Sequence, residues 1–412
     1  MNKIPLLLFI FFSISGWMNA QIVSDLFPRL EQKNQVILHY EEESNNTAFT
    51  NSFASMYHNS EHIDRETLLR ERSYQQASNL LGQKRKFELS LLLKDKEKED
   101  RSYYIGLSHQ RLASLYYNDE AVDLVFFGNK AYRGDSINIP FLKSYALYIE
   151  QIKLGQVLYF KSASTRSFFQ WSGAFSIGQN YHQLDITDSY FYTAPDGEFI
   201  DIEAHAIYEA SDTSWTNIFV PSGKGISADI QYGIEIQNRY YLEANIRNIG
   251  FLSWSKTPQI LSTDTTIHFE GVHIDIDGMQ DTTSTNPLTK DIMHSQYVSS
   301  FIRMTPVSLS ATAGMYFLEK KVFIGSKLRY FTHIHNRILF SLWGSYQLRN
   351  ETFISVKSLY GGFGNWNIGM HIVMPVNKKI RMQAGTDYLN SIFAKHGRGL
   401  GWNVSFRYSF NK

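Results

Sequence analysis

The chain has 412 residues, a formal net charge of +1 and no cysteine. The lack of cysteine excludes disulfides and thiol-based metal or redox centres, and the near-neutral charge gives no field that would attract nucleic acid. Aromatic residues make up 15% of the chain and charged residues 19%, against about 25% charged residues in typical soluble domains.

The first residues have the layout of a secretory signal peptide. Lys3 is followed by an apolar run from Ile4 to Ile14 and by small residues up to Ala20. We expect residues 1–20 to be removed and residues 21–412 to form a single domain. The rest of the chain lacks an apolar stretch of about 20 residues, the length that a membrane helix needs. A closed β-barrel is the other fold that can cross a bilayer, because each strand satisfies the backbone of its neighbours.

Strict alternation of apolar and polar residues recurs along the chain and predicts strands with two different faces. It is clearest in residues 200–208, 225–236, 366–374 and 380–388. Similar segments begin near Phe87, Tyr103, Trp171, Val322 and Ile338. A soluble β-sandwich would show the same alternation, but residues 21–412 are long for one sandwich and aromatic pairs such as Tyr103-Tyr104 gather at strand ends.

The connections between these segments fall into two classes. Asn238-Arg239, Glu319-Lys320 and Asn377-Lys378 leave almost no spacer, which predicts hairpins. Residues 211–224, 256–265 and 278–295 are long and polar. This asymmetry is typical of outer-membrane barrels. We therefore predict an all-β fold, a transmembrane antiparallel β-barrel of about 14 strands, with 12 to 16 possible.

Two stretches interrupt the alternation and predict small helical inserts. Residues 64–81 carry leucines near helical spacing, with Asp64 as N-cap. Asp119 to Phe127 is a shorter helix that closes at Gly128-Asn129. Either helix could plug the lumen, lie at the rim or simply belong to a loop.

Charged residues on the strands are assigned to the inner face, because a lipid-facing charge costs about 2–4 kcal/mol at the bilayer midplane. The candidate lumen-facing residues are Asp229, Glu235, Glu243, Arg247, Lys327, Arg329, Arg381 and Asp387. Such a lumen could line an aqueous channel, or its charges could pair and keep the barrel shut.

The last strand has an apolar face formed by Trp402, Val404, Phe406, Tyr408 and Phe410. An amphipathic terminal strand with an aromatic residue near its end is the signal that barrel-assembly machinery reads, although an ordinary edge strand would look similar. The expected partners are outer-membrane lipid, that machinery during insertion and further envelope proteins.

No enzymatic, cofactor or metal site is expected. His273, Asp275 and Asp277 share a face near His268, but a polar loop would contain such residues by chance. Serine, histidine and aspartate are scattered without a glycine elbow. Phosphate-binding loops, dinucleotide glycine patterns and zinc motifs are not found in the sequence.

Three patches, Leu124–Asn129, Gly223–Asp229 and Ile246–Trp254, resemble an uncharacterised family of Bacteroidota outer-membrane barrels, in the style of PorP-type and FadL-like barrels. The resemblance implies a barrel in the outer membrane but no agreed activity. It leaves open a transport or channel role for a solute or hydrophobic compound, and a non-conducting accessory subunit of a secretion, gliding or surface-assembly machine. An outer-membrane enzyme is the more remote alternative.

The assignment of strand faces predicts the outcome of two neighbouring substitutions. Ile230→Arg should impair insertion, since it places a charge against lipid, whereas Asp229→Ala should not. The amount of each variant recovered from outer membranes measures the effect. Equal yields of the two variants would overturn the face assignment.

Overall fold

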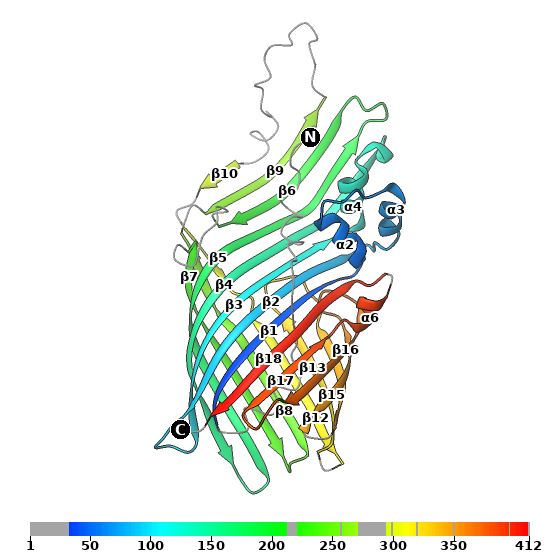
Figure 1. The fold of residues 1–412 in the computed structure, drawn as a ribbon. Helices are drawn as coiled ribbons and strands as arrows, with labels where there is room; N and C mark the ends of the chain where they lie inside the picture. The colour runs from blue at the N-terminus through cyan, green and yellow to red at the C-terminus, as the bar shows by residue number, and fades with distance from the viewer. Residues whose placement is uncertain are drawn as a thin grey trace.

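The protein is an antiparallel barrel closed by fourteen strands (Figure 1). The computed structural model describes residues 33–211, 221–255, 258–270, 294–297, 300–318, 320–348, 351–394 and 396–410. The barrel strands are β1 Asn34–Asn46, β2 Asn79–Lys94, β3 Arg101–Tyr117, β4 Asp135–Lys161, β5 Thr165–Thr193, β7 Gly223–Ile236, β8 Tyr240–Trp254, β12 Ser308–Phe317, β13 Val322–Phe331, β14 Leu339–Gln347, β15 Phe353–Tyr360, β16 Trp366–Pro375, β17 Ile380–Thr386 and β18 Gly399–Phe410.

The ring closes because the first and last strands pair with each other. The β1–β18 ladder runs from Asn34 opposite Phe410 to Asn45 opposite Gly399. Each remaining barrel strand pairs with the barrel strands on both sides of it, so the ring has no open edge. The predicted barrel of about 14 strands is confirmed.

Four further strands lie outside this ring: β6 Ile200–Ala210, β9 Gln259–Phe269, β10 His294–Tyr297 and β11 Phe301–Met304. The long strand β5 pairs with β7 over residues 165–178 and with β6 over residues 182–193. β6 then pairs with β9. We call β6 and β9 the ribbon; it projects beyond the barrel wall at the top of Figure 1.

The two ends of the barrel differ in their connections. At one end, called the short-turn end, neighbouring strands are joined by tight turns such as residues 237–239 and 376–379. Gln237 and Asn238 have φ values of 52° and 53°, the conformation that a tight hairpin turn requires. Glu319 lies outside the described residues. The opposite end, called the long-loop end, carries the helices and the ribbon (Figure 1).

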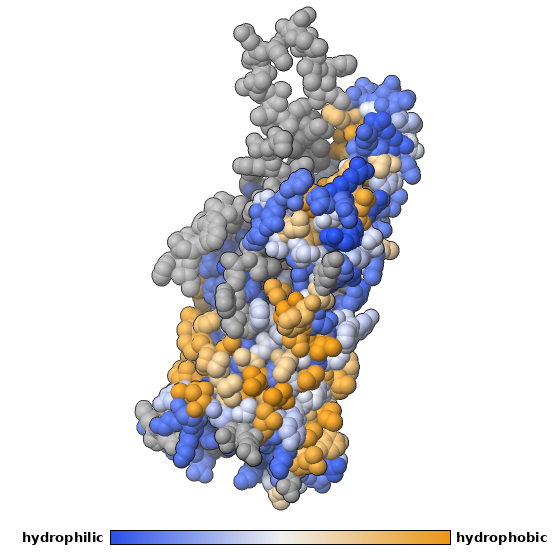
Figure 2. Space-filling view, turned by 45° about the vertical axis from the view of Figure 1, so that its right-hand side comes forward, coloured by the Kyte–Doolittle hydropathy of each residue, from blue (hydrophilic) through white to orange (hydrophobic). Residues whose placement is uncertain are grey.

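The outer wall carries a belt of exposed apolar side chains. Ile230 is 39% exposed, Ile226 57% and Leu242 47%, all on the outer face of their strands. Figure 2 shows apolar residues gathered around the lower part of the wall, with polar residues at the rim below and over the region above. This exterior is that of a transmembrane barrel. None of the described helices is long and apolar enough to cross a membrane.

The helices are α2 Asn51–His58, α3 Arg65–Ser73, α4 Asp119–Phe127, the short 3-10 turn Lys130–Tyr132 and α6 Leu389–Phe393. The helical insert predicted over residues 64–81 was too long. Asp64 does cap α3, since its carboxylate accepts a hydrogen bond from the Thr67 amide at 2.7 Å. The helix nevertheless ends at Ser73, because Leu80 and Leu81 join the β2 ladder opposite Tyr116 and Leu115.

Helices α2, α3 and α4 form a cap on the outer wall of β2, β3 and β4 and do not enter the lumen. Their buried side chains pack against outward-facing wall residues in one cluster: Phe49, Phe53, Leu81, Ala113, Leu115, Tyr117, Val122 and Ala146. Glu71 ties α3 to the start of α2, since its carboxylate accepts hydrogen bonds from the Thr50 amide at 2.9 Å and hydroxyl at 2.8 Å. The cap therefore shields the wall above the apolar belt.

Candidate functional site

The lumen is filled by three layers of inward-facing side chains. Near the short-turn end, aromatic residues dominate two clusters: Tyr241, Tyr316, Phe323, Trp343, Phe353 and Val373, and Leu92, Tyr104, Val157 and Phe168. Near the long-loop end lies a third apolar cluster: Leu112, Tyr145, Leu147, Ile149, Tyr181, Leu252, Trp254, Phe301, Phe331, Ile334 and Phe363. Polar and charged residues occupy the layer between these clusters.

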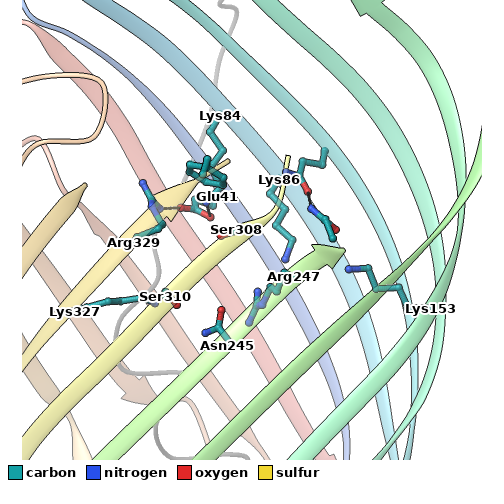
Figure 3. A pocket seen from close by; sticks show the side chains of 13 residues that line it. Glu41, Lys84, Lys86, Lys153, Asn245, Arg247, Ser308, Ser310, Lys327 and Arg329 are labelled. Carbon is teal, nitrogen blue, oxygen red and sulfur yellow. Dashed lines mark hydrogen bonds and ion pairs between the residues drawn. The ribbon is translucent and has the colours of Figure 1, made fainter. Parts of the chain in front are cut away.

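The middle layer encloses a small chamber of about 40 Å³ (Figure 3). A space of that size has room for a few water molecules or one small ion. Its lining residues are Glu41, Lys84, Lys86, Gln110, Lys153, Asn245, Arg247, Asn248, Ser308, Ser310, Lys327, Arg329 and Phe331. They come from β1, β2, β3, β4, β8, β12 and β13, so strands from both sides of the barrel build it.

One group of ion pairs bridges the lumen. Lys84 on β2 donates to Glu41 of the neighbouring strand β1 at 2.5 Å. Arg329 on β13 reaches the same strand from across the barrel, at 2.8 Å from Glu43 and 3.4 Å from Glu41. Strands β13 and β1 are separated by β14 to β18 around the ring. The Arg329–Glu43 pair therefore holds opposite walls together.

A second group of polar contacts lies beside it. Lys153 on β4 donates to Asp229 on β7 at 2.5 Å, and the other carboxylate oxygen of Asp229 accepts the Asn248 amide at 2.8 Å. The Asn248 side chain donates in turn to Gln110 on β3 at 3.2 Å, which is a second bridge across the lumen. Asn248 adopts a φ of 63° at an irregular step in the β7–β8 ladder, which turns its side chain inward.

Positive charge gathers where these groups meet. Figure 3 shows Lys86, Lys153 and Arg247 directed toward one another from β2, β4 and β8. Lys86 pairs with Glu88. Among the described residues, the chamber has six basic lining residues: Lys84, Lys86, Lys153, Arg247, Lys327 and Arg329. Four carboxylates line it or pair with its basic residues: Glu41, Glu43, Glu88 and Asp229.

Half of the residues that the sequence predicted to face the lumen line this chamber or pair with its lining residues. Arg247, Lys327 and Arg329 line it, and Asp229 pairs with Lys153. Glu235 lies near the short-turn end with Arg166 and Lys320, and Glu243 accepts the Tyr241 hydroxyl at 2.6 Å. Arg381 pairs with Glu351 at the rim, and Asp387 pairs with Lys357 and His371 at 2.8 Å each.

Sequence reasoning missed the β1, β2 and β4 contributors, Glu41, Glu43, Lys84, Lys86 and Lys153. A signal for part of this set was present, because Lys84, Lys86, Glu88 and Ser90 occupy every second position of one strand. Which strands face one another across the lumen depends on the ring order. The bridges therefore could not be read from the chain alone.

The other sequence-based candidates lie elsewhere. Trp402, Phe406 and Tyr408 are 38%, 40% and 43% exposed on the outer wall, and their role as an insertion signal stays a prediction. His273, Asp275 and Asp277 lie outside the described residues. In the part of the chain that the structure describes, no group of three or more histidine or carboxylate side chains is arranged to hold a metal ion.

His268 belongs instead to a set of histidine–carboxylate pairs on the ribbon. Its ring nitrogens lie 2.5 Å from Asp201 and 3.3 Å from Glu270. His205 lies 3.0 Å from Glu203 and 2.8 Å from Asp264. Hydrogen bonds to Glu203 and Asp201, respectively, raise the pKa values of His205 and His268.

These contacts predict a ribbon that loosens as the pH rises. A raised pKa in the folded state means that the protonated histidines stabilise the ribbon. The contribution is complete below about 6.5, the ordinary histidine pKa, and is lost as the pH passes the raised values. Hydrogen-exchange protection factors for residues 200–210 should fall over that range. The double variant His205→Gln/His268→Gln should lose this pH dependence, and an unchanged profile would refute the assignment.

Solved structures to which the chain is similar include a toluene transporter, a FadL homologue and an outer membrane protease. The P. putida toluene transporter TodX is 8% identical, with a TM-score of 0.48 and coverage of 93% of this chain and 91% of that chain. A Pseudomonas aeruginosa FadL homologue is 10% identical, with a TM-score of 0.37 and coverage of 92% and 90%. The outer membrane protease OmpT from Escherichia coli is 11% identical, with a TM-score of 0.23 and coverage of 92% and 97%. No curated protein matches the chain in sequence.

A family model gives a more direct result. Residues 159–387 match the family of unknown function DUF5723, over a range that includes strands from both sides of the chamber. The resemblance to an uncharacterised barrel family agrees with this match in part, whereas a Bacteroidota origin stays a prediction. Because the matched residues make up more than half of the sequence, the chain belongs to DUF5723, a family of unknown function.

Proposed function

We propose that the protein is an outer-membrane barrel that passes small anionic solutes through its lumen. The closed ladder and the exposed apolar belt support a position in a membrane. The asymmetry between the short-turn and long-loop ends supports the outer membrane, with the long-loop end facing the cell exterior.

The chamber carries the proposal for transport. A barrel interior can be filled stably by apolar side chains or by matched ion pairs. Here six basic residues and the carboxylate of Glu41 line a space of about 40 Å³ among the described residues. Three further carboxylates, Glu43, Glu88 and Asp229, pair with the basic residues. Gathering like charges in a poorly hydrated interior is costly. Local costs of this kind are typical of functional sites, where a ligand offsets them.

The chemistry of the lining indicates the kind of solute. Lysine and arginine rings select anions in membrane pores. The amides of Asn245 and Gln110 and the hydroxyls of Ser308 and Ser310 add neutral hydrogen-bonding groups to the same surface. A hydrated anion entering this layer would exchange water for these groups.

Passage requires a gate. The Arg329–Glu43 pair ties β13 to β1 through the middle layer, and aromatic clusters fill the lumen above and below it. Solute movement then depends on rearrangement of these side chains. The same filled lumen supports the second candidate, a non-conducting accessory subunit that uses the barrel as an anchor.

Removing the cross-lumen pair tests whether the lumen is a pathway. The double variant Glu43→Gln/Arg329→Gln removes both charges and leaves no single buried charge behind, so the barrel should still fold. Its current in a planar lipid bilayer should exceed that of the wild type. If neither protein carries current although both migrate as folded barrels, the transport proposal fails and the accessory role is favoured.

Ion selectivity in the same bilayer tests the role of charge in the chamber. Asp229→Asn should increase the preference for chloride over potassium, and Lys153→Gln should decrease it. Each change should be about fivefold, which corresponds to about 1 kcal/mol for one charge near water. Lys378→Gln, in an exposed turn at the short-turn end, is the matched control. Equal selectivity in all four proteins would contradict an anion-selective chamber.

A further inference from the structure

The outer wall has a charged row between the apolar belt and the helical cap. Arg85 on β2 stands directly opposite Arg111 on β3, and both occupy outward positions. Two rows toward the short-turn end, the same two strands carry Leu89 and Leu107, which are 37% and 48% exposed. On the other side of the arginine row, the outward positions carry Ala113, which packs beneath the cap.

This position corresponds to the edge of the hydrocarbon layer. The outward row Leu38, Leu89, Leu107 and Ile152 is entirely apolar across four strands. The next row begins with Tyr40 and ends with the His109–Glu150 pair, and the row after that holds the two arginines. Charges on a lipid-facing wall are costly at the midplane and cheap near the interface, so these rows mark the headgroup level.

The two arginines have different partners, a carboxylate for Arg85 and an aromatic ring for Arg111. Arg85 donates from Nε to Glu42 at 3.1 Å and makes a second, closer contact with the same carboxylate. The guanidinium of Arg111 lies over the Tyr148 ring, 4.8 Å from its centroid. Its Nε is buried and has no hydrogen-bond acceptor among the described residues. Like charges directly opposite on one sheet face repel, so the row carries a positive charge that a further anion would neutralise.

We propose that Arg111, together with Arg85, binds a phosphate group of an outer-leaflet lipid. A guanidinium offers a planar pair of donors that matches two phosphate oxygens. Tyr40, Tyr148 and Trp402 flank the arginine row, as amphipathic aromatic residues do at membrane interfaces. The lipid's acyl chains would lie on Leu89 and Leu107 below. The inference rests on the proposed membrane location but not on transport.

Native mass spectrometry of the full-length barrel in dodecyl maltoside tests this site. The probe is dilauroyl phosphatidic acid, with uncharged dilauroylglycerol and inorganic phosphate as separate arms. Arg111→Gln should bind the phosphatidic acid about tenfold more weakly, because hydrogen bonds between ions are lost. Lys96→Gln, which removes a charge from the exposed turn of the same hairpin, should bind like the wild type.

Comparison of the three probes distinguishes a lipid phosphate site from the alternatives. Equal retention of phosphatidic acid by the wild type and Arg111→Gln overturns the proposal, as does equal retention of dilauroylglycerol and phosphatidic acid by the wild type. Displacement of the lipid by inorganic phosphate at similar concentration would show a free-anion site and overturn the lipid assignment. Arg111→Lys keeps the charge and the alkyl stem, so it serves if Arg111→Gln does not fold. The affinity of Arg111→Lys for phosphatidic acid should be lower than that of the wild type and of Lys96→Gln, because an ammonium group lacks the paired donors of a guanidinium.

Discussion

The structure depends on one constraint, the closure of the backbone hydrogen-bond ladder between β1 and β18. A strand edge left open in a bilayer would expose amide and carbonyl groups where water cannot satisfy them. Closure converts the alternation along each strand into an outer and an inner surface that are continuous around the ring. The apolar belt, the filled lumen and the charged row on the wall all follow from this separation of faces.

Inside the ring, closure brings together residues that are far apart in the chain. Arg329 and Glu43 are separated by 286 positions, yet their side chains lie 2.8 Å apart. Such contacts tie opposite walls through the middle layer. They also concentrate charge, because each strand contributes its inward polar positions to the same level. The lumen is therefore crossed by ion pairs and lined by basic residues whose repulsion a bound anion would reduce.

Outside the ring, unequal strand lengths shape the long-loop end. β4 and β5 have 27 and 29 residues, whereas β15 has 8, so one side of the wall rises far above the other. The taller side supports the ribbon and provides the wall surface that the helical cap covers. Between the cap and the apolar belt, Arg85 and Arg111 occupy the level where the environment changes from lipid to water. The same wall thus serves as membrane anchor, as scaffold for the cap and as a surface for headgroup phosphates.

The sequence by itself determined the fold class, because two local signals indicate it. Period-two alternation indicates strands with one apolar and one polar face, and short joints indicate antiparallel hairpins, and a closed barrel is built from both. It predicted about 14 strands, the α4 helix and the N-cap of α3 at Asp64, all of which rest on neighbouring residues. It placed the end of the α3 insert wrongly, since Leu80 and Leu81 suit either a helix or a strand and only pairing with β3 decides between them. The tertiary structure alone decided the chamber and the arginine row, because both depend on ring order and register, which bring together residues that local sequence cannot connect.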